Sequence, residues 1–213
     1  MFRTLCSVLT RILTPPACIN CGADGALLCA RCQNNLHPKL RRIAGSPETF
    51  SCFSYTTPVV RALLGEWKYR ANREAGALLC AQFSDALRAQ QRAYKKSSTI
   101  VLPIPTRRSN RNMRGFSPPH VLAHAASAAL GIPVHDGLRF VRRGKRQAEL
   151  DLAKRRQNMH NALVLRGTLP HGAASGILID DVRTTGATLL AAAPALQQRG
   201  VQDIHAITLA WKP

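Results

Sequence analysis

The sequence predicts an α/β domain with a largely parallel sheet, preceded by a small cysteine-bearing unit. Short apolar segments alternate with amphipathic helical segments through most of the chain, and four cysteines form a compact pattern near its start. One apolar strand also ends in two acids followed by a turn rich in threonine and glycine. The 213 residues suffice for one domain of ordinary size with a small appendage.

Hydrophobic periodicity assigns the elements in chain order. Residues 2–13 are expected to form a short amphipathic helix that docks on the protein itself, with a membrane-surface or organelle-targeting helix as the alternative. Residues 39–48 have the composition of a linker. Strands are expected at residues 50–55, 100–105, 162–165, 176–179 and 204–211, and helices at residues 59–68, 73–94, 119–130 and 187–199. No segment approaches the ~18 apolar residues of a membrane span, which favours a cytoplasmic chain.

Charge indicates an anionic partner. The formal net charge is +19, whereas 46% of residues are apolar and only 19% are charged, which excludes a disordered polyelectrolyte. Residues 61–175 hold 21 of the 30 basic side chains and only six acids. The anion is therefore expected at the middle of the chain, and nucleic acid, a phosphorylated metabolite or an acidic membrane would all satisfy it.

The four-cysteine pattern predicts a structural zinc site. Each Cys-x-x-Cys turn aims two thiolates at one point, and two turns supply the tetrahedral sulfur set of zinc. All four positions would be filled by the protein, so the metal should stabilise rather than catalyse. The alternatives are a pair of disulfide loops or a redox-active Cys-x-x-Cys. The pattern consists of Cys18, Cys21, Cys29 and Cys32.

The acid pair and the turn after it predict a cradle for ribose 5-phosphate. Asp180 and Asp181 stand at the carboxyl end of an apolar strand, the edge where open α/β sheets bind ligands. The turn opens a helix and presents backbone N–H groups and hydroxyls to a phosphate; it comprises Thr184, Thr185, Gly186, Ala187 and Thr188. Carboxylates beside a phosphate suit sugar hydroxyls or Mg²⁺. The alternative is that the acids only cap a turn and the threonines only start a helix.

Clustered basic residues provide two further candidate sites. Four arginines after the strand at residues 100–105 could clamp a pyrophosphate, or could form a solvated basic loop; they are Arg107, Arg108, Arg111 and Arg114. A second set could follow a nucleic-acid backbone, with Trp67 and Tyr69 as stacking platforms or as core residues; it comprises Lys68, Arg70, Arg142, Arg143, Arg155 and Arg156. His120 and His124 have the spacing of a metal pair but no third ligand, which disfavours a metal there.

These motifs together resemble a known family. Residues 177–188 resemble the phosphoribosyl pyrophosphate (PRPP) signature of type I phosphoribosyltransferases, and the chain from about residue 15 to 211 resembles the ComF/GntX family of competence-type proteins. The other matching pieces are the cysteine pattern, Trp67-Lys68-Tyr69-Arg70, Leu102-Pro103-Ile104-Pro105 with the arginines after it, Arg114-Gly115-Phe116, Gln147, and Arg155 with Asn158. The chain departs from the family pattern at Ser117-Pro118, where Asn-Gln is usual, and at Arg183, where an apolar residue is usual.

The resemblance implies a fold, ligands and two alternative roles. It implies a zinc knuckle in residues 1–45 and a Rossmann-like type I phosphoribosyltransferase fold in residues 46–213, binding PRPP with Mg²⁺. It implies a part in natural transformation or in the use of incoming single-stranded DNA, beside a helicase or recombination partner. One hypothesis is an enzyme that transfers phosphoribose to an unknown acceptor. The other is a non-catalytic, PRPP-sensing module that binds single-stranded DNA.

Overall fold

The chain is built around a five-stranded sheet. The computed structural model describes residues 16–90, 94, 96–141 and 162–213. The strands lie in the order β1-β2-β7-β6-β3, with β1 antiparallel to β2 and all other pairs parallel. Their bounds are β1 (Arg41–Ile43), β2 (Glu48–Ser54), β3 (Thr99–Pro103), β6 (Ser175–Arg183) and β7 (Asp203–Trp211). The predicted α/β class with a mainly parallel sheet is confirmed.

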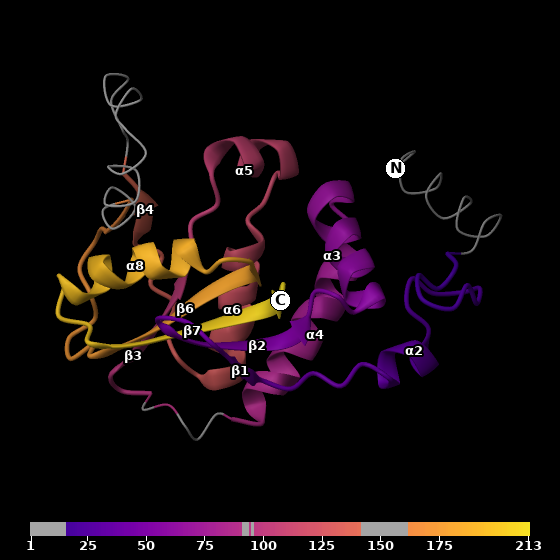
Figure 1. The fold of residues 1–213 in the computed structure, drawn as a ribbon, viewed down its shortest axis with the longest axis horizontal. Helices are drawn as coiled ribbons and strands as arrows, with labels where there is room; N and C mark the ends of the chain where they lie inside the picture. The colour runs from indigo at the N-terminus through magenta and orange to yellow at the C-terminus, as the bar shows by residue number, and fades with distance from the viewer. Residues whose placement is uncertain (1–15, 91–93, 95, 142–161) are drawn as a thin grey trace, which may run out of the picture.

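Helices cover both faces of this sheet, as Figure 1 shows. The buried side chains of β6 alternate between two cores: Ile177 and Ile179 pack in the core that contains α3, α4 and α6, and Leu178 packs in the core that contains α8. These helices are α3 (Pro58–Arg70), α4 (Arg73–Arg88), α6 (Pro118–Leu130) and α8 (Ala187–Gln197). Among the described residues, no helix has both the length and the apolar character needed to cross a bilayer.

The helix starts follow from local sequence. α3 and α6 each carry proline in the first turn, where a missing N–H removes no helical hydrogen bond. α4 begins after Asn72, whose side chain accepts hydrogen bonds from the N–H groups of Glu74 (3.0 Å) and Ala75 (3.3 Å). α4 ends at Arg88, before the predicted end at residue 94.

Several segments differ from the sequence prediction. Residues 39–48 are not a plain linker, because β1 lies within them and pairs with β2. β5 (Leu163–Leu165) does not join the main sheet but pairs with β4 (Leu138–Phe140) as a small antiparallel sheet. The arginine-bearing stretch expected as a loop contains a short helix, α5 (Arg108–Arg114), which ends at Gly115 in the left-handed conformation (φ +76°).

The cysteine-bearing segment packs against the main body. It contains α2 (Ala30–Asn34), and its buried leucines, Leu28, Leu36 and Leu40, lie in the same core as α3 and α4. The division into folding units at residue 45 therefore stays a prediction, which metal removal tests. The helix predicted for residues 2–13 lies outside the described residues.

Candidate functional site

The strand, acid pair and turn lie in one continuous run at the carboxyl end of β6. β6 continues through both aspartates, because its pairing with β7 extends to Arg183 opposite Trp211. The chain then reverses at Gly186, which has φ +75° and directly precedes α8. A side chain at Gly186 would be strained and would also lie 3.0 Å from the Nε atom of Arg183. Glycine at this position therefore lets the chain pass directly from strand to helix.

This run forms a small cavity. It encloses about 40 Å³ and is lined by Asp180, Val182, Arg183, Thr184, Thr185, Gly186, Ala187, Thr188 and Leu189. The N–H of Ala187 donates to the Thr185 hydroxyl (3.3 Å), so the turn is held by its own threonine. The cavity thus combines one carboxyl group, a helix N-terminus and threonine hydroxyls, which together could hold a phosphorylated sugar.

The two aspartates differ in their surroundings. The carboxylate of Asp181 lies 2.8 Å from the ammonium of Lys68 on α3, and both side chains are only 13% exposed. Asp180 lines the cavity and accepts a hydrogen bond from the N–H of Asp181 (2.8 Å). Burial and the neighbouring charge of Asp181 raise the pKa of Asp180 well above its usual value, although the Asp181 N–H and Lys68 oppose this shift. The site therefore contains one neutralised carboxylate and one that resists ionisation.

Lys68 is the residue whose position differs most from the sequence expectation. The sequence places it among the candidate nucleic-acid contacts, but its ammonium is largely buried against Asp181. A signal was present in the sequence, since Lys68 lies four residues after Leu64 and so shares its buried helical face. Arg70, from the same group, is exposed and pairs with Glu66 at 2.7 Å. The other four arginines of that group lie outside the described residues: Arg142, Arg143, Arg155 and Arg156.

The arginine segment, residues 107–116, does not line the cavity at β6. The guanidinium carbon of Arg107 lies 5.6 Å from the ring centroid of Phe140, and that of Arg114 lies 5.3 Å from the ring of Tyr69. Arg108 and Arg111 are exposed on α5. Two arginines are thus held on aromatic faces, and two project from the helix between them.

Trp67 and Tyr69 differ in burial: Trp67 is a core residue, and Tyr69 is exposed. Trp67 is buried and stacks on Phe116 at a centroid distance of 5.8 Å, as expected of a core residue. Tyr69 is 70% exposed beside Arg114 and could serve as a stacking platform. A cavity of about 540 Å³ opens next to Trp67, lined also by Ala71, Arg73, Gly76, Ala77, Cys80, Arg114, Gly115, Phe116 and Val121.

Arg183 faces the β1–β2 turn. Its guanidinium donates to the carbonyl oxygen of Ala44 (2.7 Å) and lies against Gly45 and Gly186. It therefore ties the turn at Gly186 to the edge of the sheet, and Arg183 also lines the cavity at α8.

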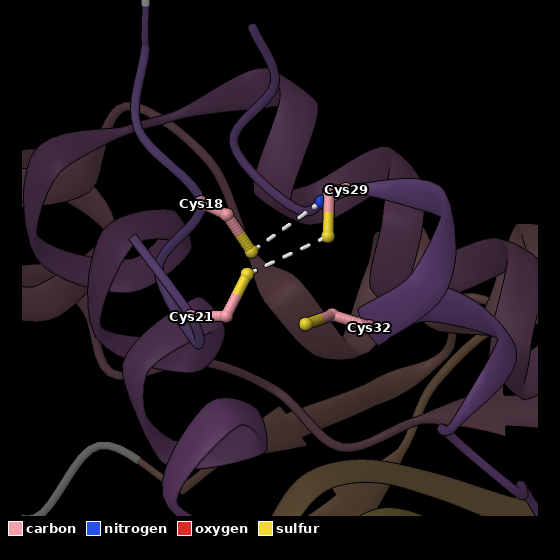
Figure 2. Close-up of side chains that lie close together, drawn as sticks. All are labelled: Cys18, Cys21, Cys29 and Cys32. Carbon is pink, nitrogen blue, oxygen red and sulfur yellow. Dashed lines mark hydrogen bonds between the residues drawn. The ribbon is translucent and has the colours of Figure 1, made fainter. Parts of the chain in front are cut away.

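The four cysteines converge on one point, as Figure 2 shows. Their sulfur atoms all lie within 4.8 Å of one another, and those of Cys21 and Cys29 are 3.7 Å apart. A tetrahedron with zinc–sulfur bonds of about 2.3 Å has edges of about 3.8 Å, so the spacing fits such a metal. The Cys29 N–H donates to the Cys18 sulfur (3.4 Å), and this bond, together with backbone hydrogen bonds from Cys21 and Asn20, lowers the pKa of Cys18 to about 6 despite burial. The cluster could therefore hold a metal such as zinc.

No family model matches the chain. It is 26% identical over 203 residues to competence protein F of Haemophilus influenzae, covering 92% of this chain and 84% of the relative. It is 26% identical over 208 residues to DNA utilization protein YhgH of Salmonella typhimurium, covering 94% and 87%. It is 27% identical over 153 residues to competence protein ComFC of Bacillus subtilis, covering 70% of this chain and 58% of that protein.

Solved structures with a similar arrangement include phosphoribosyltransferases. Purine phosphoribosyltransferase of Pyrococcus horikoshii gives a TM-score of 0.41 at 21% identity, over 63% of this chain and 75% of that one. Adenine phosphoribosyltransferase of Leishmania donovani gives 0.40 at 15% identity, over 80% and 86%. Over most of its length the chain is similar in sequence to competence proteins of the ComF type, which confirms the predicted resemblance to that family.

Proposed function

We propose that the chain has a type I phosphoribosyltransferase fold and binds PRPP together with Mg²⁺ at the carboxyl end of β6. One observation carries the proposal: Asp180 and the whole turn from residue 182 to 189 line a single cavity at the N-terminus of α8. An anion at a helix N-terminus is stabilised by the free N–H groups there, and the threonine hydroxyls can add further donors. The 5-phosphate of PRPP satisfies these groups, and its ribose hydroxyls satisfy Asp180.

The charges around the cavity are compatible with this ligand. Two free carboxylates would repel a phosphate, but Lys68 neutralises Asp181 and the raised pKa of Asp180 limits its negative charge. Mg²⁺, when bound, supplies positive charge to the pyrophosphate and prefers carboxylate oxygens among protein ligands. Arg108 and Arg111 are exposed and could pair with the pyrophosphate oxygens.

The reaction that this arrangement supports is displacement at the anomeric carbon of PRPP. The bond from that carbon to the pyrophosphate oxygen breaks, and a bond to the nucleophile of an unidentified acceptor forms. The arginines would stabilise the departing pyrophosphate, and the turn at residues 184–188 would hold the 5-phosphate in place.

A second candidate function is non-catalytic, and charge distribution favours it. The middle of the chain, residues 61–175, holds 21 of 30 basic side chains, more than one pyrophosphate needs. Exposed Tyr69 beside Arg114 pairs an aromatic face with a cation, as single-strand binders do. The named relatives include competence proteins and a DNA utilization protein. We therefore propose that the chain handles incoming single-stranded DNA in the cytoplasm, beside a helicase or recombination mediator.

We further propose that the cysteine cluster holds structural Zn²⁺. Two of its sulfurs already accept hydrogen bonds, from the Cys29 N–H and from the Asn20 side-chain amide to Cys32 (3.3 Å). Such bonds stabilise thiolate ligands. Because four protein sulfurs fill a tetrahedral site, no position is left for substrate.

Isothermal titration with PRPP, with and without Mg²⁺, tests the ligand. We expect Mg²⁺-dependent binding that is lost in Asp180→Asn and in the Asp180→Asn, Asp181→Asn double variant, whereas the exposed control Asp85→Asn binds as the native protein does. Pyrophosphate release with candidate acceptors then separates the enzyme from the sensor. Native protein that binds no PRPP would contradict the proposal. For DNA, affinity for an oligothymidylate should fall steeply between about 50 and 200 mM salt.

A further inference from the structure

A chain of hydrogen bonds joins the two ends of the arginine segment. Thr106 directly precedes this segment and Ser117 directly follows it, and their hydroxyl oxygens lie 2.7 Å apart. The Ser117 hydroxyl is also 2.8 Å from Nδ1 of His120, and Nε2 of His120 is 2.9 Å from the carboxylate of Asp136. These hydrogen bonds form one continuous line that runs from Thr106 through Ser117 and His120 to Asp136.

The direction of each hydrogen bond can be assigned from chemistry. A carboxylate only accepts, so Nε2 of His120 carries the hydrogen that goes to Asp136. In the neutral ring Nδ1 then accepts from the Ser117 hydroxyl, whose oxygen accepts from Thr106. Each donor in this line therefore faces one acceptor.

Asp136 anchors the line firmly. Arg139 donates to its carboxylate (2.8 Å) and also to its backbone carbonyl oxygen (3.1 Å). Burial opposes ionisation of Asp136, but the contacts with Arg139 and His120 outweigh it and lower the pKa of Asp136. The carboxylate therefore has a cationic partner on β4 in addition to His120.

Ser117 is used in an unusual way for a residue before a helix. It precedes α6 at the N-cap position, where serine normally accepts hydrogen bonds from N–H groups of the first turn. Here the next two residues are Pro118 and Pro119, which have no N–H to donate, and the Ser117 side chain makes no cap. Its hydroxyl is therefore available to Thr106 and His120.

The order serine, histidine, aspartate does not make this a hydrolytic triad. Ser117 is only 7% exposed, and its hydroxyl is already engaged on both sides. A substrate could not reach that oxygen without breaking the line, so the cluster acts on the protein rather than on a ligand.

We infer that His120 is a positioning residue that, through Ser117 and Thr106, holds the two ends of the arginine segment together. With its ends fixed, the segment presents Arg108 and Arg111 from a closed loop, and less conformational entropy is lost when an anion binds. The effect on PRPP affinity rests on the proposed function above. The positioning of the arginine segment does not depend on that function, because it is a property of the free protein.

Hydrogen exchange of the free protein, followed by mass spectrometry, tests the inference. The reporters are amides of α5, such as the N–H of Arg111 bonded to Arg107 (3.0 Å) and that of Gly115 bonded to Arg111 (2.8 Å). Ser117→Ala and His120→Ala should each accelerate exchange in residues 107–116 about three- to tenfold, the effect of one lost net hydrogen bond. The double variant should show little more than either single change, because both break the same line.

Three further variants keep the test specific. His124→Ala, an exposed histidine one turn further along the same helix, should leave exchange unchanged. His120→Gln, which retains a donor for Asp136, should recover part of the protection. Thr106→Val breaks the line without changing α6, and it should also accelerate exchange in residues 107–116. This variant keeps the test valid if the Ser117 and His120 variants fold poorly.

The outcomes separate this inference from the proposed function. Unchanged exchange in residues 107–116, or acceleration spread equally over α6 and the sheet, would overturn the positioning role. If exchange responds as expected but the native protein binds no PRPP, the positioning role stands and the proposed ligand is wrong. If PRPP binds, its affinity should fall in Ser117→Ala and His120→Ala but not in His124→Ala.

Discussion

Replacing Lys68 by methionine should strongly destabilise the protein. The change keeps the apolar stem of the side chain and removes only the ammonium that lies 2.8 Å from Asp181. At that separation the attraction is about 6 kcal/mol for an effective dielectric constant of about 20, and desolvation of both groups offsets part of it. Because both side chains are 13% exposed, removing one partner leaves an unpaired buried charge, and we expect a loss of about 3–5 kcal/mol.

Urea unfolding measures this loss as a lower midpoint at an unchanged m-value. Thermal unfolding should shift down by about 10 °C, since 1 kcal/mol corresponds to about 2–4 °C in a chain of this size. Lys68→Met combined with Asp181→Asn should recover most of the stability, because no charge is then left unpaired.

Arg70→Ala is the matched control. Arg70 lies on the same helix and pairs with Glu66 at 2.7 Å, but its side chain is 76% exposed, so it should contribute no more than about 1 kcal/mol. If Lys68→Met costs no more than Arg70→Ala, the buried pair does not stabilise the carboxyl end of β6 and the reasoning fails.

Two other predictions concern the acid at the cavity and the cysteines. Burial raises the pKa of Asp180, so the ionised carboxylate destabilises the folded protein at high pH. Asp180→Asn should therefore increase the free energy of unfolding by about 1–2 kcal/mol at pH 8 and abolish the proposed PRPP binding. As the pH falls through the raised pKa, Asp180 of the folded native protein takes up a proton and its charge disappears. Denaturant titrations at decreasing pH should therefore show a smaller stability gain for Asp180→Asn, and a gain independent of pH would contradict the raised pKa of Asp180. Metal analysis should find one zinc per chain, and chelation or Cys29→Ser should lower the melting temperature, whereas Cys80→Ala should retain the zinc. Because Leu28, Leu36 and Leu40 pack with α3 and α4, the loss should extend beyond the first forty or so residues; purified reduced protein without zinc would overturn the site.

The strand, turn and helix around Asp180 and the cysteine cluster were predictable from the sequence. The apolar run before Asp180 and the glycine after Thr185 were sufficient to predict a strand, a tight turn and a helix, and the structure contains all three. The paired Cys-x-x-Cys turns likewise implied convergence of four sulfurs, which Figure 2 confirms. In each case neighbouring residues determine the geometry.

The parts that were missed depend on contacts between distant residues. α5 has no buried residue, so no apolar periodicity marked it as a helix. β5 lies within the strand predicted at residues 162–165, but β4 and its pairing with β5 across a long connection were not predicted, because a short apolar run does not reveal its partner. The ion pair of Lys68 with Asp181 and the contact of His120 with Asp136 join separate elements, and no local pattern predicts either contact.

The turn at residues 184–188 and the arginine segment are held in place in different ways. The turn at residues 184–188 follows directly from a paired strand into a helix and is tied at one side by Arg183 to Ala44, so its shape is set by the main chain. The arginine segment has no strand partner, and it depends on side-chain contacts at its ends and on two aromatic faces. Variants that break the hydrogen-bond line at Thr106, Ser117 and His120 should therefore accelerate exchange in the arginine segment and leave the turn at residues 184–188 unchanged.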